Sequence, residues 1–200
     1  MVAVGIIKTR IKKNLEEIVR KLVENNEIFS EDDLKIKLVR ELHDIVVSGD
    51  RDVDIRAEHT LKMDGKRSGK IDLLIYIKRK PKIIIELKVA LFKDHSQVWV
   101  TNEKTHSVEC DLEKMLEVVL DQNNSADIAV MVVVGCTHGG QSSEWNSTEL
   151  LDITSERYEE KFRENGKELI TANHIIIRDI EAYQNRCTEK ISRNTKEWMA

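Results

Sequence analysis

The spacing of apolar residues predicts two amphipathic helices in the first quarter of the chain. Residues 8–28 carry apolar side chains at helical spacing along one face. These are Ile11, Leu15, Ile18, Val19, Leu22 and Val23. Ser30 suits a helix N-cap, and the acidic residues after it suit the positive end of the helix dipole. We therefore expect a second helix that continues to about Val47 and ends near Gly49.

The next stretch of the chain predicts three consecutive strands. Residues 53–61 alternate between apolar and polar side chains, and residues 63–69 are typical of a turn with two glycines. Two strongly apolar runs follow, Lys70–Ile77 and Lys82–Ala90, joined by a basic turn that contains the only proline, Pro81. Consecutive strands with short connections form a meander, so we expect these three to pair in order.

The remainder of the chain alternates between helical and strand patterns. The predicted helices are 111–122, 154–165 and 180–198, and the predicted strands are 128–134 and 174–178. Gly166 is a suitable stop for the helix before it. Residues 97–100 form a short strand or part of a loop, and the polar segment around 136–147 is predicted to be a loop.

A helix that connects strands of one sheet indicates a crossover, and hence a mixed sheet with helices on both faces. The expected fold class is α/β, a three-layer α/β/α arrangement around a central mixed β-sheet. We expect one domain over residues 1–200. It comprises helices within 8–49, a core of about 31–135, and a strand and helices within 150–200.

Three charged residues interrupt the apolar hairpin, where charges are normally confined to strand ends. They are Asp72, Glu86 and Lys88. Side chains alternate across a strand, so Glu86 and Lys88 share one face of the second run. If the turn is centred on Arg79, Asp72 lies opposite Glu86, and if it is centred on Lys80, Asp72 lies opposite Lys88. Both registers place the three charges in one patch.

Two carboxylates on adjacent strands repel each other unless positive charge lies between them, and Lys88 supplies only part of that charge. A divalent cation would supply the rest. Magnesium binds one or two protein carboxylates, retains waters and completes its shell with phosphate oxygens, so the patch predicts phosphate ester chemistry. The alternative is a ladder of ion pairs on a solvated sheet face. Leu74, Tyr76 and Ile84 share that face, which indicates that it is at least partly covered.

A third carboxylate is expected near the patch. Glu41 projects at the edge of the apolar stripe of the second predicted helix, so it either pairs with a lysine or arginine or acts as a ligand. Glu58, on the neighbouring strand, is the other candidate. A surface pair between Glu58 and Arg56 or a lysine is the simpler interpretation for that residue.

These elements resemble the PD-(D/E)XK nuclease superfamily, which has the restriction-endonuclease-like fold. The resemblance rests on the helical Glu41, the strand with Asp72, the sequence IIIELK containing Glu86 and Lys88, and the following helix and apolar strand IAVMVVV. It covers roughly residues 31–135. One departure is Ile71, which stands where the motif name has proline.

The resemblance implies roles for these residues. Asp72 and Glu86 would hold a catalytic Mg²⁺ together with the backbone carbonyl of Leu87, and Mn²⁺ would be able to replace it. Lys88 would orient and polarise the attacking water, and Glu41 would bind a second metal or a metal-bound water. In similar proteins a basic or amide residue at the position of Lys114 approaches the site, although a solvated lysine is the simpler interpretation.

The resemblance also implies an activity, a Mg²⁺-dependent endonuclease that hydrolyses phosphodiester bonds in double-stranded DNA, for defence by restriction or for DNA repair. The alternative is a catalytically inactive member of the fold that acts as a nucleic-acid-binding or assembly subunit. A homodimer is expected by analogy, because small enzymes of this fold often pair to cut two strands.

The amino-acid composition adds little to the predicted fold and activity. The net charge of −4 provides no global basic field, and basic residues near the hairpin arise readily in a chain that is 34% charged. The three cysteines are odd in number and far apart, so we expect reduced thiols. The six histidines lack the spacing of a zinc site. We expect a cytoplasmic protein, because the sequence has no long apolar run or signal peptide.

Overall fold

The computed structural model describes most of the helices and strands. The described residues are 4–28, 30–47, 52–63, 66–90, 108–122, 124, 126–136, 147–176, 185–186 and 188–189. The expected strand or loop at 97–100, the loop between 136 and 147, and most of the predicted helix 180–198 lie outside them. No helix in the described ranges is long and apolar enough to cross a membrane.

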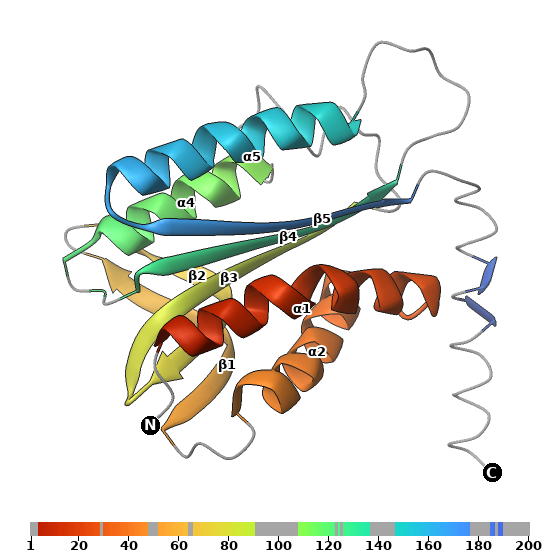
Figure 1. Ribbon diagram of the computed structural model, residues 1–200, viewed down its shortest axis with the longest axis horizontal. Helices are drawn as coiled ribbons and strands as arrows, with labels where there is room; N and C mark the ends of the chain where they lie inside the picture. Colours follow the sequence, from red (N-terminus) through yellow and green to blue (C-terminus); the bar gives the residue numbers. More distant parts are fainter. Residues whose placement is uncertain are drawn as a thin grey trace.

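Five strands form a mixed sheet in the order β1-β2-β3-β4-β5 (Figure 1). They are β1 (Val53–Met63), β2 (Lys66–Ile77), β3 (Lys80–Ala90), β4 (Ile128–Cys136) and β5 (Glu168–Ile176). The first three strands pair antiparallel, and β3, β4 and β5 pair parallel. The predicted meander and the mixed sheet are therefore confirmed.

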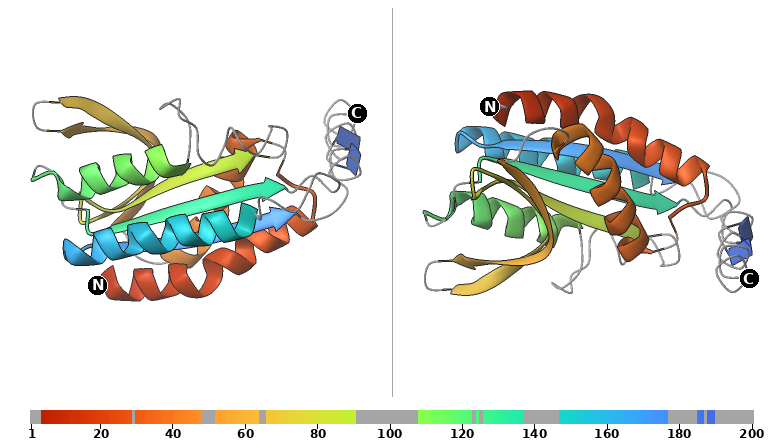
Figure 2. Two further views of the ribbon diagram at one scale, coloured as in Figure 1. Left: turned by 90° about the horizontal axis from the view of Figure 1, so that it is seen from above. Right: turned by 90° about the horizontal axis from the view of Figure 1, so that it is seen from below.

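Helices cover both faces of this sheet and complete the three-layer α/β/α arrangement (Figures 1 and 2). One layer contains α1 (Val4–Glu24) and α2 (Glu31–Leu42), which continues into the π-helical turn η1 (His43–Val47). The opposite layer contains α4 (Val108–Leu120) and α5 (Ser147–Glu164). Apolar stripes on α1 and α2 face the sheet because their polar positions fall on the opposite side of each helix.

Two local signals read from the sequence are confirmed. The Ser30 hydroxyl oxygen accepts a hydrogen bond from the backbone N–H of Asp33 at 3.2 Å, which caps α2. Gly166 has a φ of +67°, a left-handed conformation that suits glycine at the end of α5. The Ser30 cap fixes the first turn of α2, which lies beside the charged patch.

The turn between β2 and β3 differs from the prediction. Lys78 and Arg79 alone form it, both with left-handed φ angles, of 52° and 63°. Such two-residue turns match the twist of a hairpin and usually contain Asn or Gly, so the basic pair gave no signal. Pro81 therefore lies in β3 rather than in the turn, opposite Tyr76, where the register shifts.

Several element boundaries also differ from the prediction. Helix α1 ends at Glu24 rather than residue 28, and α5 begins at Ser147 rather than residue 154. Strand β2 already begins at Lys66, inside the predicted turn, and β5 begins at Glu168 rather than at residue 174. In β2 the early residues are polar but still pair with β1, so apolar periodicity alone did not reveal them. In β5 the early part that the prediction missed includes the buried apolar residues Leu169, Ile170 and Ala172.

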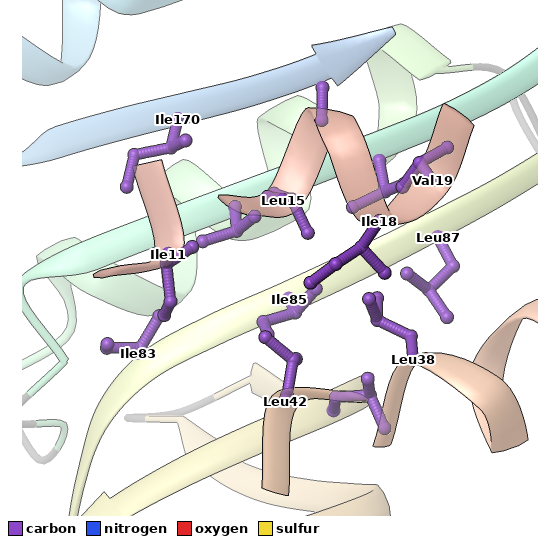
Figure 3. Packing of buried hydrophobic residues seen from close by; sticks show 14 of the residues in the cluster. Ile11, Leu15, Ile18, Val19, Leu38, Leu42, Ile83, Ile85, Leu87 and Ile170 are labelled. Atoms are coloured by element: carbon purple, nitrogen blue, oxygen red, sulfur yellow. The ribbon is translucent and has the colours of Figure 1, made fainter. Parts of the chain in front are cut away.

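Two hydrophobic clusters, one on each face of the sheet, form the core. In the first cluster, Leu38 and Leu42 of α2 point toward Leu87 and Ile85 of β3 (Figure 3). The second cluster lies under α4 and α5 and includes Ile84 of β3. Strand β3 is therefore buried on both faces, which explains why its sequence is an almost continuous apolar run.

We expect Leu38→Ala to lower the free energy of unfolding by about 2–5 kcal/mol, because it leaves a cavity between α2 and β3. Leu38 is fully buried. Ile36 lies on the same helix with 71% of its surface exposed, so Ile36→Ala should change stability by less than about 0.5 kcal/mol. Urea unfolding followed by circular dichroism measures both. Equal effects would contradict the observed orientation of α2.

Candidate active site

Asp72 and Glu86 lie level with each other where the pairing of β2 and β3 ends. The last residues paired before this point are Leu73 and Ile85. One position further, a side-chain hydrogen bond replaces the backbone pairing. The Asp72 Oδ2 accepts it from the backbone N–H of Leu87 at 2.9 Å. Of the two registers considered from the sequence, this arrangement is the one centred on Arg79.

The β2 strand changes face at Asp72. Residues two apart in a regular strand share a face. Ile71, however, packs under α4 and α5, whereas Leu73 packs under α1 and α2. On β1 the pairing likewise skips Glu58, which lies opposite Asp72 and has a left-handed φ of 51°. The regular alternation of side chains that the sequence analysis assumed for this strand therefore fails at Asp72, and Asp72 is accessible to residues from both helix layers.

Glu86 is the most deeply buried charged residue of this group, with 3% of its surface exposed. Its Oε1 lies 3.0 Å from the Lys114 ammonium, yet it has no hydrogen bond of normal geometry among the described residues. Burial raises the pKa of Glu86 to about 9; the Lys114 charge opposes this rise, and the charges of Asp72 and Asp111 add to it. Asp72 is thus close enough for its charge to affect Glu86.

Lys88 and Lys114 are both held by Asp111, on the first turns of α4. The Lys88 ammonium lies 3.0 Å from Asp111 Oδ2, and the Lys114 ammonium lies 3.2 Å from Asp111 Oδ1. Burial lowers the pKa of Lys114, but the charges of Glu86 and Asp111 outweigh it and raise the pKa overall. Lys114 therefore remains charged at neutral pH, and the sequence-based interpretation of a solvated lysine is wrong.

Lys35, from the other helix layer, reaches Asp72 from the opposite side. Its ammonium lies 3.5 Å from Asp72 Oδ1, 3.0 Å from Glu58 Oε1 and 3.3 Å from Asp32 Oδ1. Lys70 also pairs with Glu58, at 3.1 Å. Glu58, the alternative third carboxylate, is thus engaged by two lysines, and one of them links it to Asp72.

The α2 carboxylates beside the patch are Glu31 and Asp32 rather than Glu41. Burial raises the pKa of Glu31, and the charge of Asp72 raises it further while Lys88 opposes the rise, so these groups are close. Glu41 lies ten residues further along the same helix, which corresponds to about 15 Å along its axis. The structure therefore does not bring Glu41 together with the first turn of α2, where Glu31 and Lys35 meet Asp72.

The carboxylates of the patch fit a magnesium ion that binds few protein ligands. Among the described residues, no three His, Cys, Asp or Glu side chains converge as a ready-made metal cluster. Magnesium, however, needs only one or two carboxylates and keeps several waters. Asp72 and Glu86 lie level on adjacent strands, the Leu87 N–H bonds Asp72, and the buried Glu86 Oε1 lacks a directed hydrogen bond. The Lys114 ammonium lies 3.0 Å from this oxygen, so a metal ion bound here would share Glu86 with Lys114.

Three residues of the site were missed in the sequence: Glu31, Lys35 and Asp111. Signals for two of them were present. Lys35 lies between Leu34 and Leu38 on the buried side of α2, where a lysine needs partners. Asp111 lies one helical turn before Lys114, so the two side chains share a face. Glu31 gave no signal beyond an ordinary acidic first turn.

Comparisons with known proteins do not establish a function for this chain. No family model matches its sequence. No curated protein matches it either. Among solved structures, SfsA of Pyrococcus furiosus in complex with Ca²⁺ is similar at a TM-score of 0.32 and 16% sequence identity. The match covers 84% of this chain and 58% of that chain, so this chain spans less than two thirds of the SfsA length.

Proposed function

We propose that this protein is a Mg²⁺-dependent endonuclease of the restriction-endonuclease-like type, which hydrolyses phosphodiester bonds in double-stranded DNA during restriction or repair. One observation carries the proposal. Asp72 and Glu86 lie level at the point where β2 and β3 separate, and Lys88 follows on the same strand. Two carboxylates and an ammonium in this order provide the groups that metal-assisted phosphodiester hydrolysis requires.

The metal would be held by Asp72, Glu86 and the carbonyl oxygen of Leu87. When bound, Mg²⁺ lowers the pKa of a coordinated water and neutralises phosphate oxygens. Asp72 is already oriented for this role, because the N–H of Leu87 and the ammonium of Lys35 each engage one of its two oxygens. A preoriented ligand loses little conformational freedom on binding.

Lys88 would orient the attacking water and offset the negative charge that develops on the phosphate. Asp111 holds its ammonium at 3.0 Å, which restricts a long flexible side chain to the α4 side of the sheet. Lys114 adds a second positive charge beside Glu86. Two fixed ammonium groups near a phosphate stabilise the transition state without reorganisation, which supports a catalytic interpretation of this cluster.

Nucleic acid as the substrate is supported by the position of the β1–β2 hairpin. The hairpin extends beyond the other strands of the sheet (Figure 2), and the exposed Arg56 and Lys70 lie on its two strands. Phosphate contacts from lysine and arginine position proteins on a duplex. DNA in preference to RNA belongs to the proposal and is tested by the substrate screen.

One observation favours the catalytically inactive alternative, a nucleic-acid-binding or assembly subunit. Each of the two carboxylates already has its own lysine, Lys35 for Asp72 and Lys114 for Glu86. Lys88 is also paired, with Asp111. A site whose charges are balanced by lysines is stable without a metal, as a binding subunit requires.

The test is a screen of the purified chain against supercoiled, linear, branched and single-stranded DNA and against RNA, with Mg²⁺, Mn²⁺ or EDTA. We expect cleavage of double-stranded DNA in Mg²⁺ and Mn²⁺ and none in EDTA. Lys88→Met should lower the rate by about 10²–10³-fold. Lys82→Met is the matched control, because Lys82 lies on the same strand but pairs with Asp127 at 3.4 Å.

The screen separates the two functions. DNA binding without cleavage under any metal condition would favour the inactive subunit. Cleavage that persists in EDTA, or that Lys82→Met reduces as much as Lys88→Met, would contradict the assigned site. Cleavage of RNA alone would retain the chemistry and change the substrate.

A further inference from the structure

Asp111 connects two lysines beside Glu86, one through each of its oxygens. Its Oδ2 lies 3.0 Å from the Lys88 ammonium, and its Oδ1 lies 3.2 Å from the Lys114 ammonium. Lys114 also contacts Glu86 Oε1, at 3.0 Å. The side chains therefore form a series of contacts in which Lys88 and Glu86 are the two ends, separated by Asp111 and Lys114.

Lys88 could reach Glu86 directly, because the two residues share a face of β3. They pair with Val133 and Met131 of β4, and both of these pack under α4 and α5. Residues two apart on one strand are about 6.6 Å apart, a separation that the flexible stem of a lysine spans. Among the described residues, however, Lys88 forms an ion pair with Asp111 alone. The position of its ammonium is therefore set by α4 rather than by its own strand.

The pair between Lys88 and Asp111 is largely shielded from water. The exposed fractions of the two side chains are 15% and 16%. Ion pairs in such surroundings are screened less by salt than pairs on an open surface. Asp111 also lies in the first turn of α4, where the positive end of the helix dipole stabilises a carboxylate. Asp111 is therefore suited to hold a charged side chain in one place.

A lysine beside Glu86 competes with a metal ion for the same oxygens. Lys114 already places one ammonium 3.0 Å from Glu86 Oε1. If Lys88 left Asp111 for Glu86, it would add a second ammonium there, and repulsion between these charges and a divalent ion would weaken metal binding. The same movement would take the ammonium away from the attacking water. The contact with Asp111 prevents both effects.

We propose that Asp111 is a positioning residue, which holds the Lys88 ammonium away from Glu86 and so leaves this carboxylate to the metal ion. Asp111 acts through Lys88 rather than on the metal or the substrate. This inference rests on the proposed metal-dependent function and adds to it a residue from outside the hairpin.

The experiment measures the Mn²⁺ affinity of the full chain without substrate, by electron paramagnetic resonance of free Mn²⁺. Asp111→Asn keeps the shape of the side chain and removes its charge, so it should weaken Mn²⁺ binding and slow plasmid nicking, each by about 10–100-fold. In the Lys88→Met background, the same substitution should leave Mn²⁺ affinity unchanged, because no lysine is released. Glu109→Gln is the matched control, because Glu109 lies in the same turn of α4 but pairs with Arg157 of α5.

Each outcome decides the inference. A loss of Mn²⁺ affinity that is equally large in the Lys88→Met background, or in Glu109→Gln, would assign the effect to lost charge in general or to Lys114 and would overturn it. Unchanged affinity in folded Asp111→Asn would also overturn it, and Asp111→Ser repeats this measurement if far-ultraviolet circular dichroism shows that the first variant does not fold. In these cases the wild-type chain still binds metal and cleaves, so the proposed nuclease stands. If the wild-type chain binds no ion and cleaves nothing, the metal-dependent function itself fails, and the role of Asp111 fails with it.

Discussion

Asp72→Asn is expected to lower the rate of Mg²⁺-dependent DNA cleavage by about 10³-fold. The amide has the shape of the carboxylate and can still accept the N–H of Leu87, which is 2.9 Å from Asp72 Oδ2. It lacks the negative charge that a metal ligand supplies and that pairs with Lys35. The loss is therefore electrostatic rather than structural. Initial rates of plasmid nicking in Mg²⁺ measure it.

Asp127→Asn is the matched control for this substitution. Asp127 pairs with two lysines, Lys82 at 3.4 Å and Lys167 at 3.0 Å, but it immediately precedes β4 and lies outside the patch. Cleavage by this variant should stay within about threefold of the wild-type rate, since surface ion pairs contribute little. If both variants lose activity equally, the loss reflects the general removal of charge and the role of Asp72 is refuted.

The stability of the metal-free protein is expected to fall as the pH rises from about 5 to 9. Burial raises the pKa of Glu86 to about 9, against an ordinary value of 4.5, and the neighbouring acids add to this rise against the opposing charge of Lys114. Below pH 4.5 this carboxyl is protonated in both the folded and the unfolded chain. Between the two values the unfolded chain releases the proton and the folded chain retains it, so stability declines, by an amount on the order of several kcal/mol.

Urea unfolding in EDTA at intervals from pH 5 to 9 measures this decline, and Glu86→Gln isolates it. Glutamine resembles the protonated carboxyl and does not titrate, so the variant should lose the part of the slope that Glu86 causes. Added Mg²⁺ should stabilise the wild-type chain more at pH 8 than at pH 6, because the ion binds the deprotonated carboxylate. Identical slopes for the wild type and Glu86→Gln would contradict the buried position of Glu86.

The hairpin could be predicted because its signals lie in the local sequence, but its register could not. Alternation within two apolar runs placed Asp72 and Glu86 on adjacent strands but left two registers open, and the structure has the one centred on Arg79. The second of these runs predicted the buried β3, and a separate run, residues 128–134, predicted the buried β4, because strands buried on both faces carry almost no polar residues. These inferences need no knowledge of how the helices pack.

The helix contributions could not be predicted in the same way. Periodicity places a residue on a face of its own helix, but it does not tell which turn of the helix lies over the patch. Glu41 and Glu31 are both acidic residues of α2, and only the packing of Leu38 and Leu42 against β3 brings the first turn to Asp72. The change of face at Asp72 was equally hidden, because it depends on the conformation of Glu58 in the neighbouring strand.

The charged patch takes residues from both helix layers, and this has a consequence for the folding chain. Lys35 arrives with α2, whereas Asp111 and Lys114 arrive with α4, and the sheet between them contributes Asp72 and Glu86. A folding intermediate with only one layer docked would hold an incomplete set of these groups. The complete set of charged groups therefore exists only when both helix layers are docked on the sheet.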